Sequence, residues 1–160
     1  MRMFRRLLMA ALLAAALPTV AATLPNQPVP SLDIHRYAGQ WHEIARLPMY
    51  FERKCLDAVI ATYTPNPDGT VHIHNACRTS KGRMSVDGVA RMKDNQPAAL
   101  EVRFVPAWLT WLPMAWADYW VIEVDADYQW AVIGSPGRKH LWILSRRPTM
   151  DRALFQTLKE

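Results

Sequence analysis

Alternation of apolar and polar residues dominates the chain from about residue 39 onward. A period of two is typical of strands that bury one face and expose the other. Short turn signals separate the alternating runs, and the sequence Asn-Pro-Asp-Gly at 66–69 is the strongest of them. The pattern predicts eight strands, over 39–47, 57–64, 70–78, 83–92, 100–105, 119–124, 129–134 and 141–146.

Helical signals in this part of the chain are short. Residues 50–54 are expected to form a helical turn, and a final helix is expected with Thr149 as its N-cap and Asp151 in its first turn. Strands joined mostly by short turns, with no crossover helices between them, favour an all-β fold. We predict an eight-stranded antiparallel up-and-down barrel with a short C-terminal α-helix.

The first residues have the pattern of an export signal. Arg2, Arg5 and Arg6 precede an apolar run at 7–17, and small residues follow at 20–22. We expect residues 1–22 to be a signal peptide and residues 23–160 to form a single domain. The apolar run is shorter than the about 20 residues that a spanning helix needs, and an uncleaved anchor is the alternative.

Charge and cysteine content bear on partners and location. Three of the nineteen Lys and Arg residues lie in the signal, so the net charge of +5 falls to +2 after cleavage. No basic stripe for nucleic acid remains. The first cysteine is Cys55, so no cysteine at the cleavage site could carry a lipid anchor. We expect export to the periplasm or secretion, and association with the outer membrane stays open.

The two ends of the predicted meander carry residues that a closed barrel would bring together. Gly39 and Trp41 open the first strand, and Arg146 ends the last one. A guanidinium group stacked on an indole face is a favourable contact. We therefore expect Arg146 to cap Trp41 at the closed end of the barrel.

This pairing is a hallmark of the lipocalins, and residues 32–152 resemble their bacterial branch, which groups with outer-membrane lipocalins and apolipoprotein D-like proteins. The segments that carry the resemblance are 37–46, 119–122, 125–132 and 141–146. A single Gly-x-Trp would be a weak signal, but four motifs in the right order are specific. The resemblance implies a barrel that holds one small hydrophobic ligand.

Alternation predicts which side chains face the interior. Glu101 and Arg103 need water, so Val102 and Phe104 point inward. The same rule turns Ala61 toward the interior of the second strand. In lipocalins with small hydrophobic ligands the matching positions line the pocket, and the resemblance implies this role for Tyr63, Asn75, Phe104, Tyr119 and Trp142. The alternative is that these residues only fill a narrow core, although small residues at 61, 88 and 90 leave space.

Few polar side chains have an inward phase, and Glu43, Asn75 and Glu123 are the main ones. Buried polar groups need partners, which suggests the headgroup of an amphiphile. Pairing of both glutamates with nearby arginines is the alternative.

The connection at 106–117 carries Trp108, Trp111 and Trp116 at the barrel mouth. An exposed apolar rim would suit contact with a membrane surface, whereas the same loop could fold down as a lid.

Cys55 and Cys77 are expected to form a disulfide. The turn at 66–69 places Cys77 opposite Ala58, three positions from Cys55, and neighbouring strands bring Cα atoms within the range that a disulfide tolerates. An exported chain with an even number of cysteines also favours a bridge. The alternative is a free, nucleophilic Cys77, as in a lipocalin that isomerises a fatty-acid derivative.

Other catalytic signals are weak. His72 and His74 share an outward face, but a metal site would need a third ligand. No phosphate-binding loop or nucleophile elbow occurs, so we predict neither a cofactor nor catalysis. We predict binding and transport or storage of a small hydrophobic or amphipathic molecule, a fatty acid or lysophospholipid, in the bacterial cell envelope. The alternative is a lipid-modifying isomerase or oxidoreductase on the same scaffold.

Overall fold

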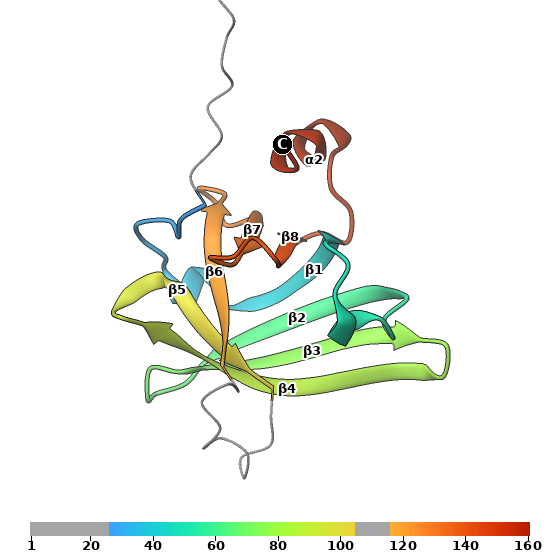
Figure 1. The fold of residues 1–160 in the computed structure, drawn as a ribbon, viewed down its shortest axis with the longest axis horizontal. Coiled ribbons are helices and arrows are strands. Elements are labelled where there is room, and N and C mark those ends of the chain that lie inside the picture. Colours follow the sequence, from blue (N-terminus) through green and yellow to red (C-terminus); the bar gives the residue numbers. More distant parts are fainter. Residues whose placement is uncertain (1–25, 105–115) are drawn as a thin grey trace, which may run out of the picture.

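The computed structural model describes residues 26–104 and 116–160 of the chain. In these residues eight antiparallel strands form a closed barrel, because each strand pairs with the next along the chain and the last pairs with the first (Figure 1). This confirms the predicted up-and-down barrel. The strands are β1 (Gly39–Arg46), β2 (Asp57–Pro65), β3 (Val71–Thr79), β4 (Gly82–Lys93), β5 (Gln96–Arg103), β6 (Ala117–Val124), β7 (Trp130–Gly134) and β8 (Leu141–Ser145).

One strand boundary differs clearly from its prediction. The other strands lie within two residues of the expected bounds, but β5 begins at Gln96, four residues early. The turn between β4 and β5 is only two residues long, and both of its residues, Asp94 and Asn95, adopt positive φ, at 50° and 57°. Two central residues with positive φ are typical of the tight turn that matches strand twist. The predicted strand at 100–105 left out Pro97, whereas this residue lies within β5.

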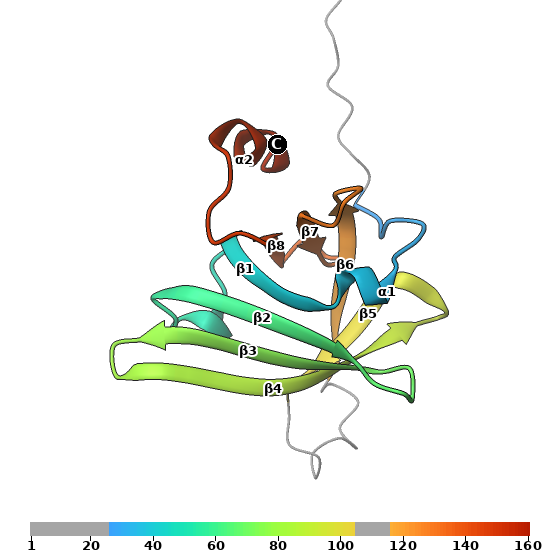
Figure 2. The same cartoon turned by 180° about the vertical axis from the view of Figure 1, so that it is seen from behind.

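Three short helical elements accompany the barrel in the part of the chain that the structure describes, namely α1 (Ile34–Tyr37), the 3-10 helix η1 (Tyr50–Glu52) and α2 (Arg152–Leu158). The N-cap of α2 is Asp151, whose carboxylate accepts hydrogen bonds from the Ala153 and Leu154 amides, so the prediction of Thr149 was wrong. Helix α1 is too short for its periodicity to be seen in the sequence, and it lies beside the start of β1 (Figure 2). None of these helices is long and apolar enough to cross a bilayer.

The closed end of the barrel is sealed by a stacked pair. The guanidinium carbon of Arg146 lies 3.8 Å from the ring centroid of Trp41, which is fully buried. Arg146 also donates to the carbonyl oxygens of Arg36, at 2.7 Å, and of Gln40, at 2.9 Å. Gly39 adopts φ +93°, and a Cβ there would meet Arg146 Nη1 at 3.4 Å. The structure thus brings together the three residues expected at this end.

Two predictions lie outside the described residues. They are the signal peptide at 1–22 and the part of the mouth connection that contains Trp108 and Trp111.

Candidate ligand-binding cavity

The opposite end of the barrel opens into a cavity of about 430 Å³. This volume falls within the range of about 300 to 1,000 Å³ for small-molecule sites. All seven residues expected at a ligand site line it, namely Ala61, Tyr63, Asn75, Val102, Phe104, Tyr119 and Trp142. They come from β2, β3, β5, β6 and β8 and from the residue after β5, so the barrel gathers positions far apart in the sequence.

Most of the inner wall is apolar, but not all of the expected space is free. A Cβ at Gly88 would lie 2.5 Å from Phe104 Cδ1 and 2.6 Å from the Arg103 carbonyl oxygen. The Phe104 ring therefore fills the room that the absent Gly88 side chain was expected to leave for a ligand. Phe104 is 38% exposed, which places it at the mouth.

A chain of tyrosine hydroxyls lies at the inner end of the cavity. The Tyr119 hydroxyl is 2.7 Å from that of Tyr37 and 2.9 Å from that of Tyr63. Burial raises the pKa of all three, that of Tyr63 to about 12, so the hydroxyls stay neutral near neutral pH. They satisfy one another, and this leaves the inner wall uncharged. Sequence reasoning missed Tyr37 in this cluster because it precedes the first strand, in α1.

Near the mouth, a guanidinium group lies between two carboxylates. Arg46 Nη1 donates to Glu43, and Arg46 Nε lies 2.9 Å from Glu52 Oε2. Trp142 Nε1 donates to the other oxygen of Glu52 at 3.2 Å. Only 7% of the Glu43 side chain and 16% of the Glu52 side chain are exposed.

A β-bulge makes this arrangement possible. Residues three apart in a regular strand point to opposite faces. A register shift between Glu43 and Ala45 breaks the alternation, so Arg46 can reach Glu43. Helix η1 then brings Glu52 across the mouth. Sequence reasoning missed Arg46 and Glu52, because neither the bulge nor the path of the loop has a clear sequence signal.

Both carboxyl groups are harder to ionise than usual. Burial, together with the nearby Glu52 carboxylate, raises the pKa of Glu43 despite Arg46. Burial also raises the pKa of Glu52, against the hydrogen bond from Trp142 and the charge of Arg46. One guanidinium group therefore does not fully compensate two desolvated carboxylates.

The two alternatives for the inward glutamates turn out differently. Glu43 both pairs with an arginine and lines the cavity. Glu123 was expected to point inward but does not line the cavity. A register shift between Val121 and Glu123 interrupts the alternation there.

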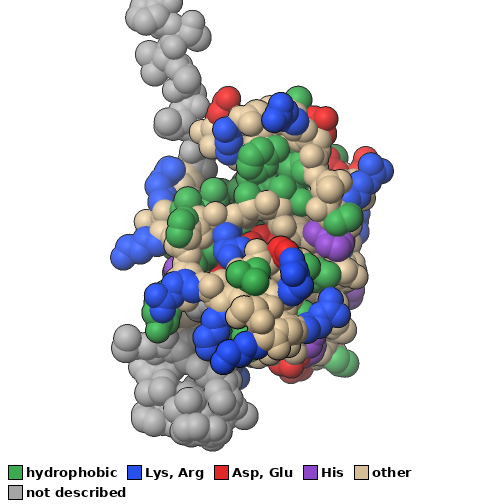
Figure 3. All heavy atoms as spheres, turned by 90° about the vertical axis from the view of Figure 1, so that its right-hand side faces the viewer, with side chains coloured by type: hydrophobic (Ala, Val, Ile, Leu, Met, Phe, Trp, Pro, Cys, Tyr) green, Lys and Arg blue, Asp and Glu red, His purple; other side chains and the backbone are tan. Residues whose placement is uncertain are grey.

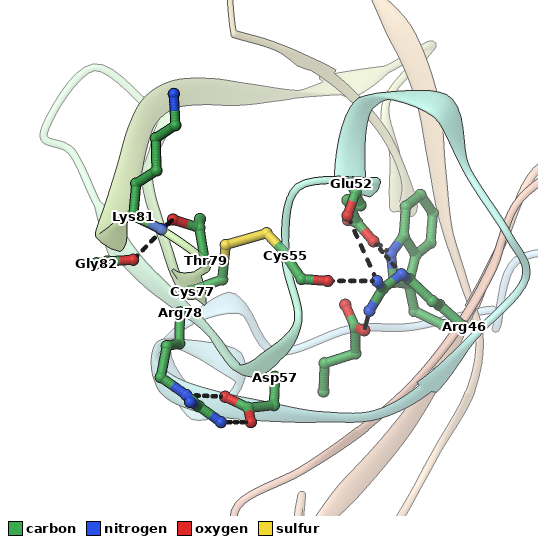
Figure 4. The surroundings of a disulfide bond; sticks show 11 residues. Arg46, Glu52, Cys55, Asp57, Cys77, Arg78, Thr79, Lys81 and Gly82 are labelled. Atoms are coloured by element: carbon green, nitrogen blue, oxygen red, sulfur yellow. Dashed lines mark hydrogen bonds and ion pairs between the residues drawn. A yellow bond between two sulfur atoms is a disulfide. The ribbon is translucent and has the colours of Figure 1, made fainter.

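The predicted disulfide is present, and it lies in the cavity wall near the mouth (Figure 4). The Cα atoms of Cys55 and Cys77 are 5.6 Å apart. A bulge between Asp57 and Ile60, with Ala58 at φ 51°, turns the chain so that Cys55 reaches β3. The bridge holds the loop after η1 against β3, and the Cys55 carbonyl lies 3.4 Å from Arg46 Nη2.

The described residues at the open end of the barrel include many basic side chains. Figure 3 views the barrel from the side of the β3–β4 turn, and Lys and Arg side chains surround much of this face. Trp116 was expected to be part of an apolar rim, but the guanidinium carbons of Arg91 and Arg103 lie 4.0 Å and 4.4 Å from its ring centroid. Its ring is thus covered by charged groups, which gives no support to membrane insertion by this residue.

His72 and His74 lie on the outer face, as their phase predicted. His72 Nε2 and His74 Nδ1 contact the same oxygen of Asp87, at 3.0 Å and 2.9 Å respectively. Within the described residues no group of three or more His, Cys, Asp or Glu side chains could hold a metal ion.

Comparisons with known proteins agree with this architecture. A family model described as a lipocalin-like domain matches residues 32–160. Temperature-induced lipocalin-1 of Arabidopsis thaliana is 42% identical over 82% of this chain and 72% of its own length. Outer membrane lipoprotein Blc of Citrobacter freundii is 36% identical over 90% of this chain and 81% of its own. Insecticyanin from the tobacco hornworm Manduca sexta shares the fold, with a TM-score of 0.63 at 20% identity over 86% of this chain and 76% of that one.

Proposed function

Because the chain belongs to the lipocalin family, whose members bind small hydrophobic ligands, we propose that it binds and carries a single-tailed amphiphile, a fatty acid or a lysophospholipid. The observation that carries the proposal is the cavity, with an apolar inner part and charged groups near the mouth. An apolar tail would contribute about 25 cal/mol for each Å² that it buries there. The polar groups near the mouth would set its orientation.

We place this activity in the bacterial cell envelope. Relatives named outer membrane lipoproteins, the signal-like residues 1–22 and a disulfide, which suits an oxidising compartment, support this location. Detection of a chain that begins at residue 23 in a periplasmic fraction, by mass spectrometry of the intact protein, would test it.

The alternative of a lipid-modifying enzyme gains no support from the cysteines. A nucleophilic Cys77 needs a free thiolate, and this residue is bonded to Cys55. We therefore propose a binding protein rather than an isomerase or oxidoreductase.

Blocking the cavity from within tests the binding function. Ala61 lines the cavity, so Ala61→Trp should weaken binding of a fluorescent fatty acid at least about tenfold, by filling the site. Thr64→Trp, at an exposed position of the same strand, is the matched control and should bind normally. Equal affinity in the two variants would place the ligand outside the cavity. Native mass spectrometry of the purified protein, followed by lipid extraction, would identify the ligand.

A further inference from the structure

The polar groups inside the cavity differ in what they offer a ligand. Each nitrogen of Arg46 already contacts an oxygen of Glu43, of Glu52 or of the backbone. The indole N–H of Trp142 is directed at Glu52 as well. A ligand carboxylate would compete at these donors with the carboxylates of Glu43 and Glu52 and with the backbone carbonyls that they already contact.

Acceptors, in contrast, are in excess. The two carboxylates of Glu43 and Glu52 face the single guanidinium group of Arg46, which leaves one negative charge uncompensated when both are ionised. Independently, the Asn75 Oδ1 atom is buried in the same cavity and has no hydrogen-bond partner among the described residues. A buried acceptor without a donor is costly.

The remaining charged groups of the cavity have contacts outside the group formed by Glu43, Arg46 and Glu52. Arg103 and Asp118 also line it, with opposite charges, and each has a contact of its own: Arg103 stacks on Trp116, and Asp118 accepts a hydrogen bond from Lys93. His140 stacks on the Trp142 ring near the mouth. The inner tyrosines are neutral near neutral pH, as described above.

From these contacts we infer that the cavity selects amphiphiles whose headgroup is a cationic hydrogen-bond donor, an ammonium group, over amphiphiles that end in a carboxylate. The ammonium group would lie beside Glu43 and Glu52, and the alkyl chain would extend past Asn75 toward Tyr63 and Tyr119. Such a headgroup supplies a second positive charge and further N–H donors to the two carboxylates that share Arg46. This inference rests on the proposed function and narrows it.

The raised pKa values of the two glutamates agree with this reading, because a cation would restore the stabilisation of the charged forms that burial removes.

Competition among three ligands with the same tail tests the inference. Dodecylamine, dodecanol and dodecanoate, each below its micellar concentration, would displace a hydrophobic fluorescent probe from the whole protein near neutral pH. We expect the ammonium form to bind at least about tenfold more tightly than the carboxylate, as for hydrogen bonds to charged groups, with the alcohol between them. Lysophosphatidylethanolamine against lysophosphatidylglycerol would show whether a lysophospholipid can be the source of the ammonium group.

Charge-removing variants locate the origin of the preference. Glu43→Gln and Glu52→Gln should each reduce the ratio of amine to carboxylate affinity several-fold. Asp87→Asn makes the same change in net charge on the outer face, where Asp87 contacts His72 and His74, and it should leave the ratio unchanged.

The outcomes separate the inference from the proposed function. Displacement by all three ligands with dodecanoate as tight as dodecylamine would overturn the ammonium preference and leave the lipid carrier standing. An equal change of the ratio in Asp87→Asn and in the two Gln variants would also overturn it. Failure of every amphiphile to displace the probe would instead overturn the proposed function. If a Gln variant does not fold, the order of the three ligands in the unaltered protein still decides.

Discussion

The two ends of the barrel use an arginine in different ways. At the closed end the Arg146 guanidinium group stacks on Trp41 and donates to backbone carbonyls. All of these contacts help to close the barrel. At the open end the Arg46 guanidinium group holds two side-chain carboxylates in the wall of a cavity. The same residue type thus completes a sealed core at one end and leaves an excess of acceptors at the other. We expect changes at the closed end to alter mainly stability and changes at the open end to alter mainly ligand binding.

The largest effect on stability should come from the centre of the closed end. Trp41 is fully buried, so Trp41→Ala should cost about 3 to 5 kcal/mol, as other large-to-small core changes do. Trp142→Ala, at the half-buried indole that lines the open cavity, should cost clearly less and should weaken ligand binding. Urea unfolding of both variants, together with Arg146→Ala, measures the contrast. If Trp41→Ala and Arg146→Ala both keep the unfolding midpoint, the closed end does not stabilise the barrel as we describe.

Removal of the disulfide should have the next largest effect. Cys55 and Cys77 are separated by 22 positions, and closing a loop of this length contributes about 3 kcal/mol in the chain-entropy model. A Cys55→Ser/Cys77→Ser double variant should lose about this much free energy of unfolding. Because the bridge holds the loop that carries Glu52, probe affinity should fall too. The unaltered protein measured with and without a reducing agent is the control, and insensitivity of both quantities to reduction would contradict a structural role at the mouth.

Gly39 offers a smaller test of the closed end. Its φ of +93° is unfavourable for other residues, so Gly39→Ala should cost about 1 to 2 kcal/mol. Gly137→Ala is the matched control, because Gly137 has no positive φ and a Cβ there meets only Lys139 Cγ, at 3.8 Å. Thermal unfolding of the two variants should differ, and equal midpoints would show that position 39 does not require glycine.

The smallest effect concerns pH and the open end. The pKa of Glu43 is raised in the folded state. Near this pKa the Glu43 carboxyl group is therefore protonated more often in the folded protein than in the unfolded chain. Stability should therefore rise as pH falls from above the folded pKa toward the unfolded value, and this gain should be absent in Glu43→Gln. We expect the difference between the urea midpoints of the two proteins to shift in favour of the unaltered protein between about pH 7 and pH 5. A constant difference would mean that burial does not disfavour the Glu43 carboxylate.

Alternation along the chain was enough to predict the eight strands, apart from the start of β5, and most of the cavity wall. Period-two alternation follows from the geometry of a single strand, so the inward positions of Ala61, Tyr63 and Val102 could be deduced without any partner strand. The Trp41 and Arg146 pair was deducible as well, because an antiparallel meander that closes must bring its first and last strands together.

The polar group at the mouth, in contrast, depends on how the strands and loops pack in three dimensions. Arg46 reaches Glu43 through a bulge, and Glu123 is turned from the cavity by another. Bulges arise from the pairing of two strands, so alternation along one strand does not reveal them. Glu52 joins the group because the disulfide and η1 fix the path of a loop, and Phe104 covers Gly88 because two neighbouring strands meet there. These contacts depend on the distance between segments in space, which a periodic pattern within one segment does not contain.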